Sequence, residues 1–366
     1  MREYLLIFFV GASVTYLTTG LAGRFAHWVG AALPVRDRDV HEARIPRLGG
    51  VAMLLGLMAA MLVASYLPRM REVFVESSDA RALIAAAVVM CLVGAADDIF
   101  DLPPMAKFAG QLVSAGLLVT GGVQLLYLPV PGGFFALSPI QGQVLSIIIV
   151  VGAANAVNFV DGLDGLATGI VAIGAAAFFT YAYVFAVVQG DSRLTTPALV
   201  AVVLMSMCAG FLPHNVHPAR IFMGDAGAMP LGMLLAAATI TLTGRFSAQN
   251  TDGSSLLLTL LPIMLPLAVI LIPALDTMMA IIRRTRAGLS VSAPDKKHLH
   301  HRLLALGHTH RRAVLIMWVW AAVLSFGVVL VALVGGWATY ALVAASVLLA
   351  VVLTIGFPSR ASRRVP

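Results

Sequence analysis

Long apolar runs, separated by short polar breaks, follow one another along almost the whole chain. A helix needs about 20 residues to cross a hydrocarbon core of about 30 Å, and eleven runs approach or reach that length. The third and the seventh are short, so the pattern predicts ten or eleven membrane-spanning helices. The predicted spans are residues 4–23, 48–67, 82–96, 105–121, 142–159, 166–189, 197–212, 228–243, 256–275, 313–333 and 338–357.

The composition agrees with this pattern. Hydrophobic residues make up 60% of the 366 residues and charged residues only 11%, whereas a soluble domain is about 25% charged. We therefore predict an all-α, polytopic integral membrane protein with one membrane-embedded domain over residues 1–366. Only Arg2 and Glu3 precede the first run, which we interpret as a retained helix rather than a signal peptide. Cys91 and Cys208 lie within apolar runs and are expected to form no disulfide.

The basic residues predict the orientation. The predicted spans divide the breaks between them into two sets that lie on opposite sides of the membrane. If residues 24–47 are cytoplasmic, 18 of the 24 Lys and Arg residues fall on the cytoplasmic side and 6 on the other. Cytoplasmic loops carry the excess of Lys and Arg, so we predict that the N-terminus is outside and the C-terminus is cytoplasmic. The net charge of +7 requires no nucleic acid as a partner, because a basic inner face suits anionic lipid headgroups or a phosphorylated ligand.

With this topology, four polar segments fall on the cytoplasmic side and can form one active-site cleft. In the first, GAADDIFDLPPMAKFAGQL, Asp97, Asp98 and Asp101 follow an apolar run, and Asp97 and Asp101 are expected on one helical face. Adjacent carboxylates repel unless a divalent cation, a shared proton or a cationic group compensates. A solvated helix end is the simpler alternative. Lys107 and Gln111 lie just inside the next span, where an ammonium group needs an anion or must reach the interface.

The second segment is NAVNFVDGLDGLATG. Asn155, Asn158 and Asp161 recur at intervals of three and place polar groups along the last turns of the fifth predicted helix, and Asp164 follows in a second Asp-Gly pair. The glycines allow the backbone to turn sharply or to approach a ligand, and the carboxylates suit hydroxyl, imide or metal partners. Hydrogen bonding between helices is the alternative, and it explains the asparagines better than the aspartates.

The third segment, HNVHPARIFMGDAGAMPLG, contains Asn215, Arg220 and Asp225. Asp225 stands between two small residues at the start of a predicted helix. Its carboxylate can face a ligand in the cleft, or it can cap the helix N-terminus. Asn215 and Arg220 add neutral and cationic groups for binding a ligand.

The fourth segment is the largest cytoplasmic loop, which contains DKKHLHH. A helix start at Pro294 and Asp295 is predicted to place His298 and His301 on one face and His300 on nearly the opposite one. We favour anion binding by these histidines. Zinc ligation, for which the sequence nearby shows no cysteine or fourth ligand, and a plain amphipathic helix are the alternatives.

Several carboxylates, one lysine near membrane depth and a basic loop thus fall on one face of the membrane. Diphosphate chemistry needs a hard divalent cation and cationic side chains, so the pattern favours phosphoryl or glycosyl-phosphoryl transfer at the inner leaflet. A cation-coupled transporter is the alternative of another class, but it predicts polar residues at mid-membrane, whereas these lie at helix ends. A CDP-alcohol phosphotransferase is a second enzymatic alternative, whose motif is not matched by Gly165-Leu166.

These motifs carry a resemblance to a family. HEARIPRLGG, ADDIFD with Lys107 and Gln111, NAVNFVDGLDGLATG, FLPHNVHPARIFMGD and DKKHLHH occur in an order and spacing similar to those of the polyprenyl-phosphate N-acetylhexosamine-1-phosphate transferases, within about residues 35–312. The phospho-MurNAc-pentapeptide translocase branch of that superfamily has a triple histidine and a threonine-rich segment before its early Gly-Gly. Here the chain reads HLHH and IPRLGG, which favours the GlcNAc-1-phosphate branch.

The resemblance implies a fold of ten or eleven helices in a bacterial inner membrane. It implies transfer of GlcNAc-1-phosphate from UDP-GlcNAc to a polyprenyl phosphate, undecaprenyl or decaprenyl, giving polyprenyl-diphosphate-GlcNAc and UMP. This would be the first membrane step of a cell-wall polysaccharide pathway. Mg²⁺ would be the cofactor, with Mn²⁺ as a substitute. The resemblance is compatible with a homodimer, and with either direct transfer or transfer through a covalent intermediate.

The resemblance also implies roles for individual residues. It assigns Asp97 and Asp98 to activation of the lipid phosphate and Asp225 to the metal site. The remaining matches are implied to bind the nucleotide, the phosphates or the sugar: Asn158, Asp161, Asp164, Asn215, Lys107, His298, His300 and His301. Position 43 is Ala where some relatives have a lysine, and we expect Arg44 to take that role in the donor site.

Overall fold

The computed structural model describes residues 1–31, 45–75, 78–130, 133–188, 190–245, 278, 285–286 and 308–355. Ten of the eleven predicted spans coincide with helices in these residues, and the predicted span 256–275 lies outside them. The helices are α1 (Arg2–Trp28), α2 (Gly49–Tyr66), α3 (Pro68–Val75), α4 (Asp79–Phe100), α5 (Pro104–Thr120), α6 (Pro139–Val160), α7 (Leu166–Tyr183), α8 (Thr195–Asn215), α9 (Asp225–Arg245), α12 (His310–Leu333) and α13 (Gly336–Ile355).

Within the described residues, nine helical segments are long and apolar enough to cross a membrane. The 17-residue α5 is at the lower limit for a span. The prediction of an all-α, multi-pass membrane protein is therefore confirmed. A small antiparallel hairpin, β1 (Tyr127–Val130) with β2 (Gly133–Ala136), joins α5 to α6 and pairs Tyr127 with Ala136.

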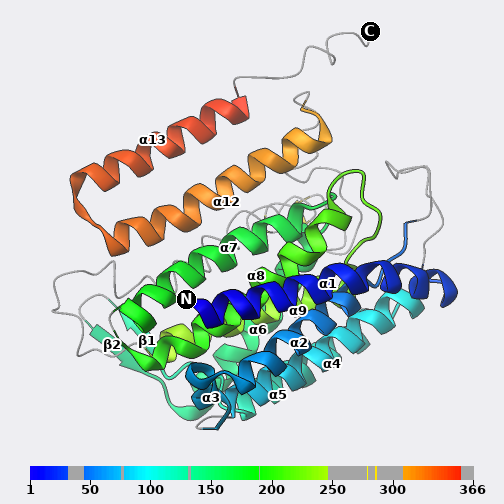
Figure 1. Cartoon of the computed structure of the whole chain (residues 1–366), viewed down its shortest axis with the longest axis horizontal. Coiled ribbons are helices and arrows are strands. Elements are labelled where there is room, and N and C mark those ends of the chain that lie inside the picture. The colour runs from blue at the N-terminus through cyan, green and yellow to red at the C-terminus, as the bar shows by residue number, and fades with distance from the viewer. Residues whose placement is uncertain are drawn as a thin grey trace.

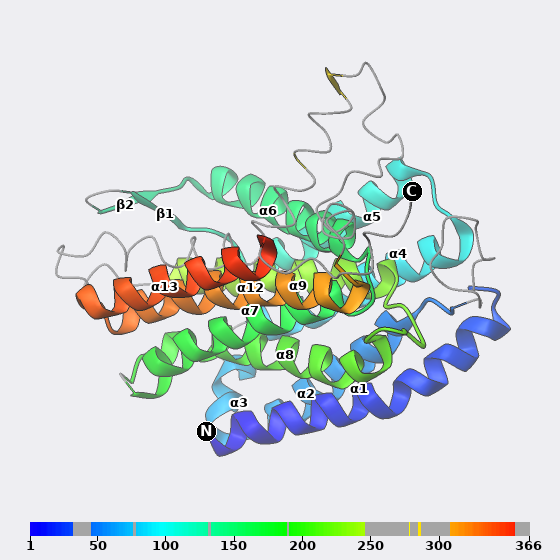
Figure 2. The same ribbon diagram turned by 90° about the horizontal axis from the view of Figure 1, so that it is seen from above.

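The long helices run roughly along one direction, and α9 lies in the middle of the bundle (Figures 1 and 2). It packs against α2, α4, α6, α7 and α8, and the apolar stretch of α9 that could span a membrane is 100% buried. By contrast, α13 packs mainly against α12 among the described elements, and α12 in turn packs against α7 of the bundle (Figure 1). The equivalent stretch of α13 is only 11% buried.

Small residues let α9 approach its neighbours closely. A methyl group added at Gly50 of α2 would collide with the backbone of Ala226 and Gly227, and one at Gly94 of α4 would collide with the backbone of Asp225. Gly232 likewise lies against the backbone of α6 at Ala153. Lipid tails are as apolar as leucine, so membrane helices associate largely through this close packing. These contacts fix the first turn of α9 against the ends of α2 and α4.

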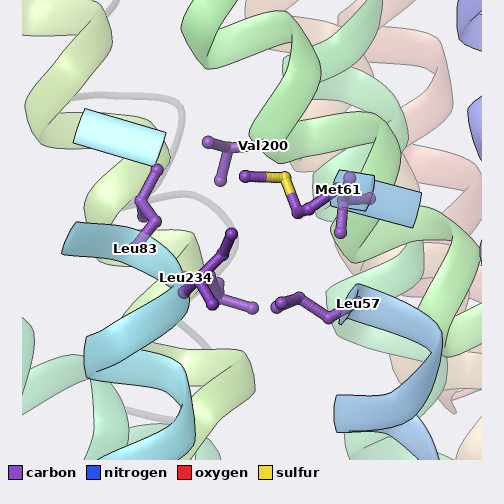
Figure 3. Close-up of a pocket in the computed structure, with 7 residues that line it drawn as sticks. Leu57, Met61, Leu83, Val200 and Leu234 are labelled. Carbon is purple, nitrogen blue, oxygen red and sulfur yellow. The ribbon is translucent and has the colours of Figure 1, made fainter. Parts of the chain in front are cut away.

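An apolar pocket lies among α2, α4, α8 and α9 (Figure 3). Leucine, methionine, isoleucine and valine side chains form its wall. Because the pocket offers no hydrogen-bonding side chain, it does not suit a nucleotide or a phosphate, and it belongs to the packing of the bundle. The lining residues are Leu57, Met61, Leu83, Ile84, Val200, Val203 and Leu234.

The end of α4 differs from the sequence-based expectation. The short third span was predicted to end before the acidic residues, but α4 continues through Asp97 and Asp98 to Phe100. Asp101 follows the helix with a left-handed φ of 52°. The expected helical spacing between Asp97 and Asp101 was therefore wrong, because the helix ends before Asp101.

Candidate active site

The ammonium group of Lys107 joins two of the predicted aspartates. Lys107 lies in the first turn of α5, and its Nζ is 3.2 Å from Oδ2 of Asp97 at the end of α4. The same Nζ contacts Oδ2 of Asp225, the first residue of α9. All three side chains keep roughly one fifth of their surface accessible. The junction of α4 and α5 and the distant start of α9 thus present two carboxylates and one cation at the same place, where a ligand can reach them.

Asp98 has a different environment from its neighbour. Its Oδ1 accepts a hydrogen bond from the backbone N–H of Asp225 (3.1 Å), and its Oδ2 accepts one from the N–H of Ala226 (3.0 Å). These are among the N–H groups that a helix leaves without intrahelical partners, at its electropositive end. Gly224 has a φ of +65°, and a methyl group there would collide with Oδ2 of Asp98. Asp98 therefore holds the start of α9 in place.

Asp97 is less completely engaged. One oxygen, Oδ1, accepts a hydrogen bond from the backbone N–H of Leu102 at 3.1 Å, which leaves Oδ2 for Lys107. Of the adjacent pair, Asp97 thus faces the lysine, while Asp98 faces the backbone of α9. The two carboxylates that looked equivalent in the sequence have different tasks.

The loop before α2 also reaches this site. Its backbone pairs with the segment before α9: Gly49 donates to the carbonyl of Phe222 (3.0 Å), and Phe222 donates to the carbonyl of Pro46 (2.9 Å). The guanidinium of Arg47 interacts electrostatically with the carboxylates of Asp98 and Asp161. Arg47 was not among the predicted site residues, although it lies in the IPRLGG stretch. The predicted Arg44 lies outside the described residues.

The polar residues at the end of α6 contact more than one neighbour. Asn155 and Gln111 of α5 exchange hydrogen bonds of 2.8 and 3.3 Å. Asn158 is half-buried one turn later. Asp161 follows the last residue of α6, where its carboxyl group is densely surrounded although part of its surface is accessible. Loss of hydration and the negative charges of Asp98 and Asp164 raise the pKa of Asp161 to about 7, against the opposing effect of Arg47.

Asn215, predicted to bind the nucleotide, joins two loops. Its Oδ1 accepts hydrogen bonds from the N–H of Gly165 (3.1 Å) and the hydroxyl of Thr168 (2.9 Å), and its Nδ2 donates to the carbonyl of Ile221 (3.1 Å). Its side chain is almost fully buried. In this structure Asn215 fastens the Asp-Gly segment to the segment before α9, and its predicted contact with a nucleotide stays a prediction.

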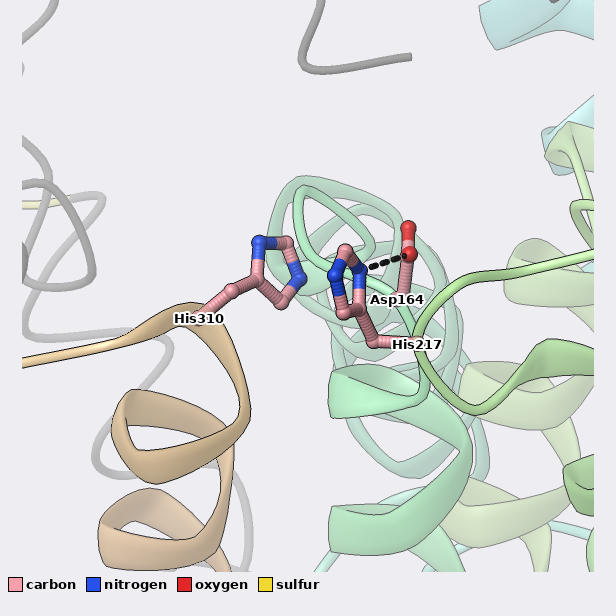
Figure 4. Close-up of side chains that lie close together, drawn as sticks. All are labelled: Asp164, His217 and His310. Atoms are coloured by element: carbon pink, nitrogen blue, oxygen red, sulfur yellow. Dashed lines mark hydrogen bonds and ion pairs between the residues drawn. The ribbon is translucent and has the colours of Figure 1, made fainter.

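Asp164 is also buried, and His217 holds it (Figure 4). Oδ2 of Asp164 lies 2.7 Å from Nδ1 of His217 and accepts a second hydrogen bond, of 3.1 Å, from the N–H of Ala219. His217 was not among the predicted site residues. The chain offers a weak signal for it, because this histidine lies in the same HNVHPAR stretch as Asn215.

The predicted site residues therefore fall into three groups. Asp164 and Asn215 are buried and tie neighbouring segments together, and Asn158 lies half-buried near them at the end of α6. The structure gathers Asp97, Asp98, Lys107, Asp161 and Asp225 at one end of the bundle through the contacts given above. Arg44 and the predicted histidines of the large loop, His298, His300 and His301, lie outside the described residues.

Comparison with known proteins identifies the relatives. A family model for glycosyl transferase family 4 matches residues 80–243. The decaprenyl-phosphate N-acetylglucosaminephosphotransferase of Mycolicibacterium smegmatis is 45% identical over 332 residues, covering 89% of this chain and 82% of the relative. A probable undecaprenyl-phosphate N-acetylglucosaminyl 1-phosphate transferase of Bacillus subtilis is 32% identical, covering 87% of this chain and 82% of the relative.

A more distant relative comes from another branch. The phospho-N-acetylmuramoyl-pentapeptide-transferase of Desulforudis audaxviator is 29% identical over 351 residues, covering 86% of this chain and 95% of the relative. The resemblance that the motifs indicated is thus confirmed across most of the chain. The chain belongs to glycosyl transferase family 4.

Proposed function

We propose that the protein transfers GlcNAc-1-phosphate to a polyprenyl phosphate. The observation that carries this proposal is the 45% identity, over 89% of the chain, to relatives named as decaprenyl-phosphate N-acetylglucosaminephosphotransferases. The relative from the MurNAc-pentapeptide branch is only 29% identical. The sequence motifs HLHH and IPRLGG favour the same choice between the two branches.

The proposed donor is UDP-GlcNAc. An oxygen of the polyprenyl phosphate attacks the phosphorus that carries the sugar, the bond between the two phosphates of the donor breaks, and UMP leaves. The products are polyprenyl-diphosphate-GlcNAc and UMP. No group of the protein needs to be consumed in this reaction, so its side chains have to bind, orient and neutralise charge.

The proposed cofactor is Mg²⁺, and the residues present fit it. Asp97 and Asp225 turn carboxylate oxygens toward one point, and hard divalent cations prefer such ligands. Bound there with the donor, Mg²⁺ would neutralise charge on the diphosphate. Lys107 balances the two carboxylates, and its ammonium can bind a phosphate oxygen of the substrates. Asp98 positions Asp225 by holding the start of α9.

The proposed location is the bacterial inner membrane, with the site at the cytoplasmic leaflet. The end of the bundle that carries Asp97 and Asp225 is the end to which the excess of Lys and Arg was assigned from the sequence. A polyprenyl phosphate in the bilayer would reach the accessible carboxylates laterally, while a nucleotide sugar would enter from water. We propose a role in the first membrane step of a cell-envelope polysaccharide pathway, for which a decaprenyl or undecaprenyl acceptor is suitable.

The test uses the purified full-length chain in detergent. It is given UDP-GlcNAc labelled in the sugar, Mg²⁺ and decaprenyl phosphate, and UMP and lipid-linked label are measured together. The proposal expects both products in equal amounts and neither without the lipid. If UMP forms at the same rate without any polyprenyl phosphate, the protein is a hydrolase and the proposal fails. Preferential use of UDP-MurNAc-pentapeptide would assign the chain to the other branch.

A further inference from the structure

Three side chains from three separate segments converge beside the start of α12 (Figure 4). Asp164 lies between α6 and α7, His217 lies between α8 and α9, and His310 is the first residue of α12. One ligand atom from each residue lies within 4.8 Å of those from the other two. Asp164 is buried, and both histidines are half-buried. None of them belongs to the pair of carboxylates that faces Lys107.

The chemistry of the three groups suits a transition metal. Two imidazoles and one carboxylate are a common ligand set for zinc, which forms bonds of about 2.0–2.2 Å to nitrogen and oxygen. In a tetrahedral site such bonds place neighbouring ligand atoms about 3.4 Å apart. Nδ1 of His217 and Oδ2 of Asp164 are 2.7 Å apart, so they must separate by a few tenths of an ångström, roughly, to admit the ion. The ring of His310 is stacked on that of His217. Because an imidazole nitrogen binds a metal in the plane of its ring, the side chain of His310 must rotate out of this stack to complete the set.

The surroundings fix Asp164 and His217 and keep His310 beside them. The rings of His217 and His310 stack with their centroids 4.4 Å apart. The guanidinium of Arg311 donates a 3.1 Å hydrogen bond to the carbonyl of His217, so α12 is docked on this loop. The N–H of Ala219 donates to Asp164. Such a hydrogen bond to a ligating carboxylate is typical of the groups that orient metal ligands.

We propose that Asp164, His217 and His310 form a zinc site, separate from the proposed Mg²⁺ site. The ion takes the place of the hydrogen between Nδ1 of His217 and Oδ2 of Asp164, and the neutral imidazole of His217 then carries its proton on Nε2. Water completes the coordination. Zinc bound there joins α12 to the loop that carries Asp161 and to the loop that follows Asn215. A hard cation such as Mg²⁺ prefers oxygen ligands, so the two sites differ in metal.

The test measures binding rather than transfer, so it is independent of the proposed function. The full-length protein in detergent is freed of metal with a chelator and then dialysed against micromolar radioactive zinc in the presence of millimolar Mg²⁺. We expect one zinc per chain, and a rise in the thermal denaturation temperature on binding. His310→Ala and His217→Ala should each weaken zinc binding at least tenfold and abolish that rise.

His214→Ala is the matched control. His214 lies three residues from His217, but its Nε2 contacts the carbonyl of Tyr16 instead, so this variant should bind zinc like the wild type. Only variants that elute as the wild type does are compared, and His310→Ala, at the end of a peripheral helix, decides the question. Failure of the wild type to retain zinc overturns the proposal. So does full retention by His310→Ala, because other residues would then hold the metal.

Discussion

Asp98 and Asp225 are joined by a hydrogen bond from the backbone N–H of Asp225 to Oδ1 of Asp98, 3.1 Å long. The carboxylate of Asp225 is thereby left to face Lys107. The second oxygen of Asp98 is also occupied, by the N–H of Ala226. Asp98 was predicted with Asp97 to activate the lipid phosphate, and the geometry instead favours a positioning role for it. Asp97, with one oxygen turned to Lys107, remains the better candidate for contact with substrate.

Asp225→Asn should raise the concentration of Mg²⁺ needed for half-maximal activity. The amide keeps one neutral oxygen ligand but loses the charge that attracts the cation, so excess metal should restore part of the turnover. A Mg²⁺ titration of UMP release in both proteins measures this. An unchanged requirement for Mg²⁺ would remove Asp225 from the proposed metal site.

Asp98→Asn should lower turnover without rescue by metal. An amide can accept only one of the two backbone hydrogen bonds, and its NH₂ group would face the other N–H. An unsatisfied buried donor costs about 1–3 kcal/mol, so the start of α9 should shift and the protein should lose stability. The checks are the same Mg²⁺ titration and thermal denaturation. If Mg²⁺ rescues this variant as it rescues Asp225→Asn, all three aspartates act as one metal site.

Asp161 should make stability depend on pH. Its pKa in the folded protein is raised to about 7 from an ordinary value of 3.8. Between these values the folded protein binds more protons than the unfolded chain, so the free energy of unfolding falls as pH rises through this window. Asp161→Asn should reduce the fall in denaturation temperature between pH 5 and pH 8. Asp101→Asn, which changes an exposed carboxylate, is the control and should behave like the wild type.

The predicted orientation can be tested with single cysteines. Val40→Cys, Asp295→Cys and Ser362→Cys should react with an impermeant thiol reagent only from the cytoplasm, and Asn250→Cys only from outside. Background labelling should be low, because the native Cys91 and Cys208 are both buried. Labelling of position 295 from outside in intact cells would contradict the common cytoplasmic site.

The helices could be predicted from the sequence because each span is a predominantly apolar run whose few polar residues lie near one end. Which helices pack against one another could not be predicted in this way. The spans of α9 and α13 are both apolar, yet one is wholly buried and the other almost entirely uncovered. Hydrophobicity cannot separate these cases, since lipid and protein interior are equally apolar. The one signal is the small residues of α9, including Gly227 and Gly232, which allow close helix packing.

In the candidate site, too, the sequence predicted which residues lie together but not what each of them contacts. Polar residues at helix ends were enough to predict that Asp97, Asp225 and Lys107 belong together. The tasks of Asp98 and Asn215 could not be predicted, because they depend on backbone groups brought to them by other segments. Those hydrogen bonds depend on where α9 begins, and at Gly224 on a left-handed φ that the sequence only suggests.

Lys107→Gln should change the Mg²⁺ requirement and the turnover in different ways. Its ammonium contacts both Asp97 and Asp225, so its loss leaves two carboxylates facing each other without a cation. Their mutual repulsion should draw in Mg²⁺ more strongly, and half-maximal activity should need less metal than in the wild type. Turnover should nevertheless fall about 10- to 100-fold, the loss expected when a charged hydrogen bond worth about 1.5–3 kcal/mol is removed from the transition state.

Arg193→Gln is the control for this variant, because it removes a cation that pairs with Asp191 at a distance from the site. It should change neither the Mg²⁺ requirement nor the turnover. Lys107→Arg keeps the charge and should leave the Mg²⁺ requirement close to that of the wild type, while its larger head displaces the substrate phosphate and lowers turnover. The opposite result, a higher Mg²⁺ requirement for Lys107→Gln, would contradict this prediction. It would mean that the ammonium holds the two carboxylate oxygens together for the metal, because they would move apart when it is lost.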